Sequence, residues 1–595
     1  MMESITLPKF LRVVDEHVSA MTHEDLAMFI HEMARTLPEA KREKFILALD
    51  KIDGSKGCEK PDSSEERDIV ITGVMDIIPK LEKIKAGERR LDSRINEEWD
   101  DWYSSDQEEF LFTDPDKLTK DIQAAIKLLH KCVDHEISDQ GSRLCEVLCD
   151  LKVLSDGDYD DCCDESDMSI EDLYDHELLQ GSFEDFAKDS LYITYIGSRP
   201  EDRAERMYGL FAGFKVNICL QDILQMGNHE LPEFEEFLKL WIECVGKHSG
   251  YPASRLLEEA QSMLQDEDTL VDNARKLVDQ HPELYLQILR AGKMDDSRML
   301  SIGLEALDRI PENLKVRSEI ALIASCYAGR SGMTELRDRC WLEALKSDTT
   351  AINYMRIKFL SSDAAKYEEE ISSILDRGLT EIKGSNSLYF FKSEFEKENK
   401  IYLKDLCVML FFEKRFSDME EIGMPSGKSP GWTMAFMEEG IAFILLLLSF
   451  GDSYSSGMDK MIMMAMETCG FSKSAFYQGI EYKDKRTDRE CFLEIIDHWR
   501  KTVSMSEEEE LSWIEKLEKW VKSITLGIMQ DNRRSHYGEC AALIAAIGEV
   551  KEDLFEIGAK DTIMMHYKEM YPKRRSFHEE LRRYGMGKKN NFYRF

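Results

Sequence analysis

Apolar residues recur at helical spacing through residues 295–359, where short polar breaks separate four groups. Within each group the apolar positions fall three or four residues apart, which places them on one face of an α-helix. Short helices that alternate with short breaks are typical of stacked helix–turn–helix units. The pattern therefore predicts four helices packed pairwise. Their apolar faces are Leu300, Gly303, Leu304 and Leu307; Ile320, Ala321, Ala324 and Ala328; Leu336, Cys340 and Ala344; and Ile352, Met355 and Phe359.

The same spacing recurs along most of the chain and predicts an all-α fold. We expect TPR-like or α-solenoid helical hairpin repeats, with an N-terminal helical unit and a basic C-terminal helical tail. No pair of alternating apolar runs indicates a β-hairpin, so we expect no strands. The expected parts are an N-terminal helical unit (1–52), a linker (53–66), a helical region with an acidic-aromatic loop (67–155), an acidic loop (156–180), a helical region (181–250), the repeat array (251–400), further helical pairs (401–530), and C-terminal helices with the basic tail (531–595).

Two helices are predicted in more detail. Leu118, Ile122, Ala125, Ile126 and Leu129 share one face of the first. The second is the most apolar run of the chain, residues 440–450. A transmembrane helix needs about 20 apolar residues, so this run predicts a buried core helix.

Composition supports a helical protein with an acidic surface. Only 13 of the 595 residues are proline, which breaks helix interiors. The chain has 116 acidic and 78 basic residues, a net charge of −38. Such a surface repels nucleic-acid phosphates and anionic membranes over most of its area. It is either an ordinary solvated surface or one that recruits a basic partner.

The cysteines and the N-terminus predict a cytoplasmic protein. No basic segment followed by an apolar one opens the sequence, as a secretory leader would require. We therefore expect the 14 cysteines to stay reduced.

Seven potential metal ligands lie close together in the first third of the chain. Thiolate and imidazole groups at this density suit zinc. The gaps between them are irregular, however, and Cys145 and Cys149 lie one helical turn apart beside leucines. Because cysteine packs well on buried helix faces, the pattern favours core packing over a metal site. The residues are His130, Cys132, His135, Cys145, Cys149, Cys162 and Cys163.

An acidic stretch partly matches a calcium-binding loop. Asp156, Asp158 and Asp160 occupy positions 1, 3 and 5, and Asp167 occupies position 12. The loop requires a glycine at position 6 for its sharp turn, where this chain has Asp161, and its last ligand is normally glutamate. These departures favour a solvated acidic loop.

The end of the chain is basic, unlike the rest. Basic residues interleaved with aromatic ones can bind RNA or single strands. The alternative is a final helix docked on the body, with its cations meeting internal carboxylates. The candidate contact residues are Lys573, Arg574, Arg575, Arg582 and Arg583, with Lys588 and Lys589 beyond them.

No catalytic motif is recognisable in the sequence. Nucleophile elbows, phosphate-binding glycine loops and zinc-protease motifs are all missing. We therefore expect a protein that is not an enzyme and that needs no cofactor or metal. A hydrolase or nuclease with dispersed carboxylates would have to show a cleft in which carboxyl groups have raised pKa values.

Several segments resemble an uncharacterised family of bacterial proteins, some of which carry a SWIM-type zinc finger. They are the acidic stretch at 230–238 leading to Trp241, the helices at 343–345 and 353–356, and the ending at 537–541 and 571–582. The resemblance implies a helical-repeat body, bacterial and cytoplasmic, of unassigned function. A SWIM finger needs Cys-x-Cys followed by Cys-x-His, which this chain lacks because Cys162 and Cys163 are adjacent. Zinc binding therefore does not carry over.

These observations favour a non-enzymatic scaffold. Its repeats would form a groove that binds an extended peptide or a helix of a protein partner, with Trp341 and Tyr354 as candidate anchors. Ordinary core packing is the alternative for either ring. The alternative function is nucleic-acid association through the basic tail.

Overall fold

The computed structural model describes ten stretches of the chain. They are residues 63–95, 110–157, 166–227, 231–264, 266–384, 397–423, 436–449, 455–483, 485–554 and 557–587. Of the described residues, 73% are helical and 3% lie in strands, so the predicted all-α class is confirmed at that level. The predicted helical unit at 1–52 lies outside these residues.

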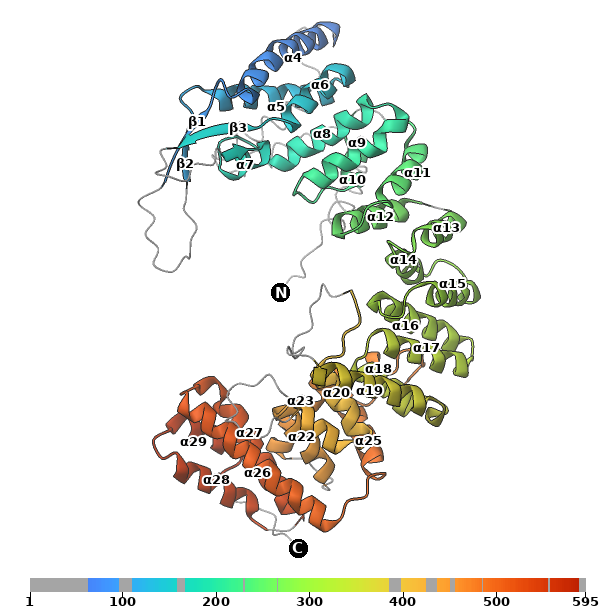
Figure 1. The fold of residues 1–595 in the computed structure, drawn as a ribbon, viewed down its shortest axis with the longest axis vertical. Helices are drawn as coiled ribbons and strands as arrows, with labels where there is room; N and C mark the ends of the chain where they lie inside the picture. The colour runs from blue at the N-terminus through green and yellow to red at the C-terminus, as the bar shows by residue number, and fades with distance from the viewer. Residues whose placement is uncertain are drawn as a thin grey trace, which may run out of the picture. The chain divides into compact units, whose positions relative to one another are not determined.

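The chain divides into two compact units, whose elements are labelled in Figure 1. Unit 1 contains residues 1–199, 214–218 and 222–232. Unit 2 contains residues 200–213, 219–221 and 233–595. The short helix α10 (Leu220–Leu224) falls where the two assignments alternate.

Unit 1 is built on helices that pack through amphipathic faces. The predicted face of α5 is confirmed, because all five of its apolar residues are buried. The expected linker at 53–66 ends in helix, since α4 begins at Ser63. The helices that contact one another are α4 (Ser63–Lys85), α5 (Leu118–Asp134), α6 (Ser138–Cys149) and α8 (Phe183–Gly197).

Unit 1 also contains a four-stranded sheet, so the expectation of no strands is wrong. The strand order is β2-β1-β3-β4, with β1 parallel to β3 and the outer pairs antiparallel. The strands are only three to five residues long and rich in Asp, Ser and Gly. Such short, polar strands show no clear alternation in sequence. They are β1 (Leu91–Ile95), β2 (Phe110–Thr113), β3 (Val153–Gly157) and β4 (Ser166–Met168).

The acidic loop expected at 156–180 is partly regular structure. It contains β4 and the short helix α7 (Ile170–Asp175). Ser169 caps α7, accepting from the Asp172 amide while the Asp172 carboxylate accepts from the Ser169 amide. This reciprocal capping box converts acidic residues into a helix start.

The first half of unit 2 is a run of consecutive helices. The four helices predicted between 295 and 359 are confirmed, and each packs on the next along the chain (Figure 1). Ile320, Ala321, Ala324 and Ala328 form a fully buried face, as expected. The run comprises α9 (Pro200–Gly213), α11 (Phe234–Val245), α12 (Tyr251–Met263), α13 (Glu267–Leu277), α14 (Glu283–Ala291), α15 (Asp296–Arg309), α16 (Lys315–Arg330), α17 (Thr334–Ser347) and α18 (Ala351–Leu360).

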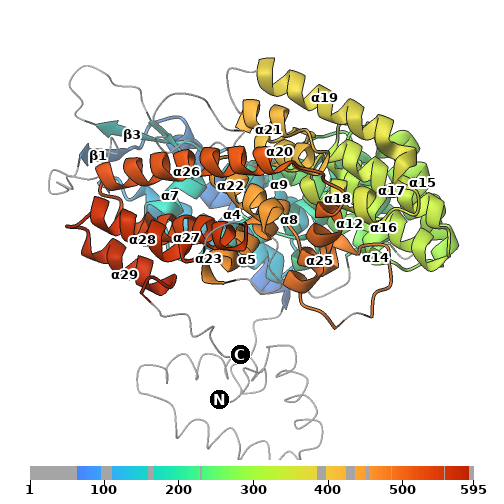
Figure 2. The ribbon, with the colours of Figure 1, turned by 90° about the horizontal axis from the view of Figure 1, so that it is seen from below.

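The second half of unit 2 surrounds one central apolar helix. The predicted core helix is confirmed as α22, in which every residue from Gly440 to Leu448 is buried. Its neighbours include α23 (Ser456–Cys469), α25 (Asp488–Arg500), α26 (Glu507–Gln530) and α27 (Tyr537–Leu554). Figure 2 shows α26, α27 and α28 side by side.

The remaining elements complete the chain to residue 583. They are η1 (Ala364–Tyr367), α19 (Glu368–Gly384), α20 (Leu403–Phe412), α21 (Phe416–Gly423), α22 (Glu438–Leu448), α23 (Ser456–Cys469), α24 (Lys473–Phe476), α25 (Asp488–Arg500), α26 (Glu507–Gln530), η2 (Arg534–His536), α27 (Tyr537–Leu554), α28 (Ala559–Met570) and α29 (Arg575–Arg583). Among the described helices, none combines the length and the apolar character that a membrane crossing needs.

Candidate functional site

A short helix in unit 2 ends against three helices that lie far earlier in the sequence. Trp341 of α17 donates its indole Nε1–H to the carbonyl oxygen of Gln478 at 2.9 Å, across 137 residues. Arg356 of α18 donates its Nε–H to the carbonyl oxygen of Ala475 at 2.7 Å, across 119 residues. The last carbonyls of a helix have no partner within it. The two side chains therefore cap the C-terminal end of α24 and the turn that follows.

Two glycines let the turn approach α16 at main-chain distance. A Cβ added to Gly329 would lie 2.1 Å from the carbonyl oxygen of Gly479. A Cβ added to Gly479 would lie 2.8 Å from Ser325 Oγ and 3.2 Å from the Ser325 carbonyl oxygen. Gly479 also has a φ of +90°, a conformation that favours glycine. We name Ser325, Gly329, Trp341 and Arg356 the docking face, and residues 475–479 the docked turn.

The docking face contains a buried cation, Arg356, whose charge is favoured by the nearby Cys326 and Asp348. Arg356 is 2% exposed and forms no ion pair within the part of the chain that the structure describes. Its guanidinium also donates to the amide oxygen of Asn353. Burial lowers the pKa of Arg356 to about 10. Cations are favourable at helix C-termini, so the end of α24 is a suitable neighbour for this charge.

The two predicted aromatic anchors are not on the surface. Trp341 is fully buried beneath the docked turn, and Arg337 stacks on its ring at 4.4 Å. Tyr354 is fully buried as well, and its hydroxyl donates to Glu413 Oε1 at 2.7 Å. Both rings take the core-packing alternative, because helix packing covers them. Trp341 nevertheless donates a hydrogen bond to a main-chain carbonyl oxygen, that of Gln478 in the same chain.

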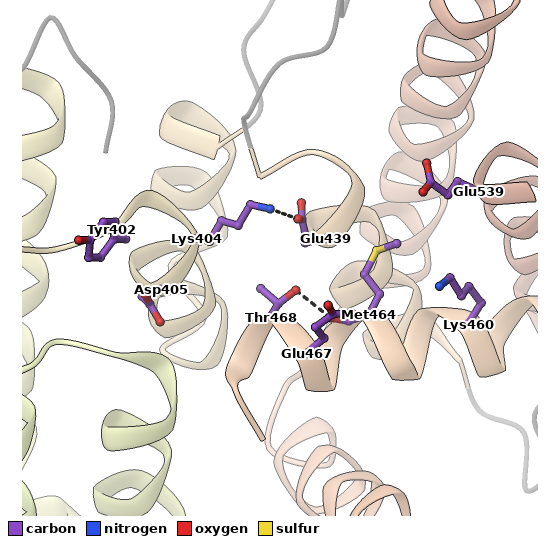
Figure 3. A pocket seen from close by; sticks show the side chains of 9 residues that line it. All are labelled: Tyr402, Lys404, Asp405, Glu439, Lys460, Met464, Glu467, Thr468 and Glu539. Carbon is purple, nitrogen blue, oxygen red and sulfur yellow. Dashed lines mark hydrogen bonds and ion pairs between the residues drawn. The ribbon is translucent and has the colours of Figure 1, made fainter. Parts of the chain in front are cut away.

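A cleft in the second half of unit 2 is a candidate binding pocket. It encloses about 440 Å³ and is open on one side. Figure 3 shows that one face of α23 forms its floor, while the starts of α20, α22 and α27 supply its other polar groups. The lining residues are Tyr402, Lys404, Asp405, Glu439, Lys460, Met464, Glu467, Thr468 and Glu539.

The charges of the cleft are mixed, with an acidic excess. Lys404 forms an ion pair with Glu439, as Figure 3 shows. Glu539 accepts from His536 at 2.6 Å, and Asp405 accepts from the Ala351 amide at 2.9 Å. Several of these carboxylates lie in the first turn of a helix, where they complement the helix dipole.

One carboxyl group beside the cleft titrates near neutral pH. Burial, followed by the charges of Glu539 and Glu439, raises the pKa of Glu438 to about 7, although His536 and Lys404 oppose the shift. A carboxylate cluster with a raised pKa is what a hydrolase of dispersed residues would require. Glu438 itself does not line the cleft, so the geometry does not bring its proton to a bound molecule.

Two cysteines of the cysteine and histidine cluster pack in the core of unit 1, whereas the His130 side chain is 62% exposed. Cys132 and Cys145 are buried, and the sulfurs of Cys145 and Cys149 lie 3.8 Å apart. His130 pairs with Asp189, with 2.9 Å between Nδ1 and Oδ2. Within the described ranges, no three ligand-type side chains converge as a metal ion would need. Cys162 and Cys163 lie outside them.

The ends of the calcium-like stretch are strands. Asp156 lies in β3 and Asp167 in β4, and these strands pair with Leu154 opposite Asp167. Asp158, Asp160 and Asp161 lie outside the described residues.

The basic tail ends in a docked helix. Phe577 and Leu581 of α29 are fully buried, and the Phe577 ring lies 5.8 Å from that of Tyr537. The docking hypothesis expected its cations to meet carboxylates of the body, but two of the described ones have other partners. Arg574 donates to the carbonyl oxygen of Met529 at 2.7 Å, and Arg583 pairs with Glu580 of its own helix at 2.7 Å.

The other predicted cations of this tail vary in environment. Arg582 donates to the carbonyl oxygen of His578 at 3.1 Å, one turn earlier in the same helix. Lys573 and Arg575 are exposed, and Lys588 and Lys589 lie outside the described residues.

Sequence reasoning missed the partners of Trp341. The only charged residue within the mostly apolar stretch 351–357 was a usable signal for Arg356, because a buried guanidinium requires acceptors. The glycines at 329 and 479 gave no such signal, since their contact joins segments that are distant in sequence.

Comparisons with known proteins assign no family and no function to this chain. No family model, no curated protein and no solved structure matches this chain. The resemblance to SWIM-related bacterial proteins stays a prediction.

Proposed function

We propose that the chain is a non-enzymatic helical-repeat scaffold, of TPR-like or α-solenoid type, that binds a helical segment of a protein partner. The observation that carries this proposal is the docking face, which holds the C-terminal end of a helix through Trp341 and Arg356. The consecutive packing of α15 to α18 supports the repeat architecture. A cytoplasmic location belongs to the same proposal, supported by the free thiol state of the described cysteines.

The chemistry of the docking face suits a helix end. Both donors are buried, so leaving either without an acceptor would carry the desolvation penalty of an unpaired polar group, about 1–3 kcal/mol. A helix C-terminus offers several unpaired carbonyl oxygens in a fixed arrangement. A partner helix ending there would satisfy the same two donors.

The overall charge favours a partner helix that is flanked by basic residues. The protein carries a net charge of −38, which attracts basic segments and repels acidic ones. The docked turn itself is followed by the exposed cations Lys483, Lys485 and Arg486. A partner helix followed by basic residues would reproduce both features.

The test is binding of a library of displayed helical peptides to the purified chain. We expect enriched peptides to lose at least tenfold in affinity for the variant Trp341→Phe. Trp241→Phe is the matched control, because Trp241 is fully buried and its Nε1 has no acceptor among the described residues. Equal binding to both variants would contradict the proposal, as would a library that yields no binder.

The cleft supports a second candidate function, the binding of an organic cation. Four of its lining residues are carboxylates and two are lysines, one of which is already paired with Glu439. An ammonium or guanidinium group would balance the acidic excess. Calorimetry with spermidine tests this, and Glu467→Gln should weaken binding severalfold. Equal binding by the wild type and this variant would remove the candidate.

The nucleic-acid alternative rests on the exposed Lys573, Arg575, Arg582 and Arg583. The hydrogen bonds of Arg574 and Arg582 to backbone carbonyls reduce the cationic surface that remains for phosphates. Nucleic acid is therefore the weaker candidate partner.

A further inference from the structure

Six charged side chains line the cleft in the second half of unit 2, and four of them have partners within the protein. Lys404 pairs with Glu439, and Glu539 accepts from His536 at 2.6 Å. Asp405 is 4% exposed and accepts from a main-chain amide at the start of α18. A bound molecule would have to break these interactions before it could use any of the four charges.

The two remaining charges of the cleft are Lys460 and Glu467, one of each sign. Both side chains are exposed, and neither has an ion-pair partner among the described residues. They lie seven residues apart on α23, which corresponds to two helical turns and roughly 10 Å along the axis. The cleft therefore offers an unpaired cation and an unpaired anion, at a fixed spacing, to a bound molecule.

Met464 lies between these two charges on the floor of the cleft, as Figure 3 shows. It is four residues after Lys460 and three before Glu467, so the three side chains share one face of α23. The unbranched thioether side chain of methionine is an adaptable apolar surface. Along the helix, the floor thus presents a cation, an apolar segment and an anion.

We propose that the cleft binds a linear ω-amino acid, with its carboxylate at Lys460, its methylene chain over Met464 and its ammonium group at Glu467. This inference rests on the second candidate function, cation binding by the cleft, and adds a required anionic end to the ligand. The volume of about 440 Å³ lies in the range of small-molecule sites.

The surroundings of the two charges favour this orientation of the ligand. Glu467 lies in the last turn of α23, which contains no basic residue. An ammonium group there would interact favourably with both the carboxylate and the C-terminal end of the helix dipole. Glu539 lies on the Lys460 side of the cleft in Figure 3, where His536 donates to it. That pairing leaves Lys460 as the group that can hold a carboxylate.

The test is calorimetry of the full chain with ω-amino acids from β-alanine to ω-aminocaprylate. The reference ligand is n-hexylamine, which matches ε-aminocaproate in chain length but has no carboxylate. The best ω-amino acid should bind at least threefold more tightly than n-hexylamine at low salt, because an exposed charge pair contributes modestly and is screened by salt. Lys460→Gln should abolish this preference without changing the affinity for n-hexylamine. Lys519→Gln is the matched control, since Lys519 is exposed on α26 and does not line the cleft.

Lys460→Glu provides a second readout, which is a switch in specificity. This variant has a carboxylate on each side of Met464, so it should prefer hexamethylenediamine to ε-aminocaproate, whereas the wild type should prefer the ω-amino acid. Because the Lys460 side chain is exposed, the variant should keep its fold, and a loss of structure would weaken both ligands rather than reverse their order. A wild type that binds the diamine at least as tightly as the ω-amino acid would overturn the inference.

The outcomes separate the inference from the function on which it rests. If ω-amino acids and n-hexylamine bind equally well and Glu467→Gln weakens both, the cleft binds cations but the inference is wrong. If none of these ligands binds, cation binding by the cleft fails and the inference fails with it. A preference for an ω-amino acid that is lost in Lys460→Gln and kept in Lys519→Gln supports both.

Discussion

The indole N–H of Trp341 binds the carbonyl oxygen of Gln478 at 2.9 Å, although 137 residues separate them in the sequence. This contact ties the second half of unit 2 to the helices α16 to α18. Together with the hydrogen bond from Arg356 to Ala475, it lets α17 and α18 hold the end of α24 through side-chain donors.

Trp341→Phe should lower the free energy of unfolding by about 1 kcal/mol more than Trp241→Phe does. Both changes remove a similar area of buried ring, but only Trp341 donates a hydrogen bond. Chemical denaturation of the two variants beside the wild type measures the difference. Equal losses would mean that the hydrogen bond to Gln478 adds nothing to stability.

Glu549→Gln should destabilise the chain by about 1–3 kcal/mol. Glu549 is 7% exposed, accepts from the amides of Gly457 and Met458 at 3.0 and 2.7 Å, and pairs with Lys560 at 2.6 Å. Glutamine replaces one of the two accepting oxygens of Glu549 with an NH2 group. That NH2 group would face a backbone N–H or the Lys560 ammonium, neither of which can accept a hydrogen bond. Thermal or urea unfolding measures the loss.

The control for that change is Glu518→Gln, which removes an exposed carboxylate paired with Lys551 at 3.0 Å. Surface ion pairs contribute about 0–1 kcal/mol, so this variant should stay close to the wild type. A loss as large as that of Glu549→Gln would show that burial is not what makes Glu549 important.

The helices could be predicted because each one carries its own signal. The face of α5 and the apolar run of α22 repeat within a single element, so local periodicity reveals them. The sheet could not be predicted in this way, because β1 pairs with β3 across about 60 residues and neither strand is long enough to alternate clearly.

The candidate site was hidden for the same reason. Trp341 was singled out as an aromatic residue on a helix, but its acceptor lies in a turn with no distinctive composition. Glu438 and Glu539 belong to helices that meet only after folding, so the raised pKa of Glu438 has no counterpart in the linear sequence. Local patterns specify elements, whereas sites depend on pairs of elements.

The double change Lys573→Glu and Arg575→Glu tests the nucleic-acid alternative. Both side chains are exposed, so α29 should remain docked through Phe577 and Leu581. If the tail binds RNA, fluorescence anisotropy with a labelled oligonucleotide should show wild-type affinity that falls with salt and is lost in the variant. We expect no binding by the wild type at physiological salt, and salt-sensitive binding there would contradict the scaffold proposal.

The pKa of Glu438 makes a prediction about pH. Its value of about 7 in the folded chain lies above the value of about 4.3 expected after unfolding. Between these two values the folded state holds more protons than the unfolded state, so stability falls as the pH rises through this window. The stabilisation is fully present below about pH 4 and is lost above about pH 7.

Glu438→Gln should therefore change the pH profile in one direction. Glutamine stays neutral in both states, so the variant should match the wild type at about pH 3.5 and exceed its stability at pH 8 by about 1–3 kcal/mol. Urea denaturation at both pH values measures this, with the exposed Glu467→Gln as a control that should follow the wild-type profile. A Glu438→Gln variant that is less stable than the wild type at pH 8 would show that the ionised carboxylate is stabilised by His536 or Lys404 more than burial penalises it.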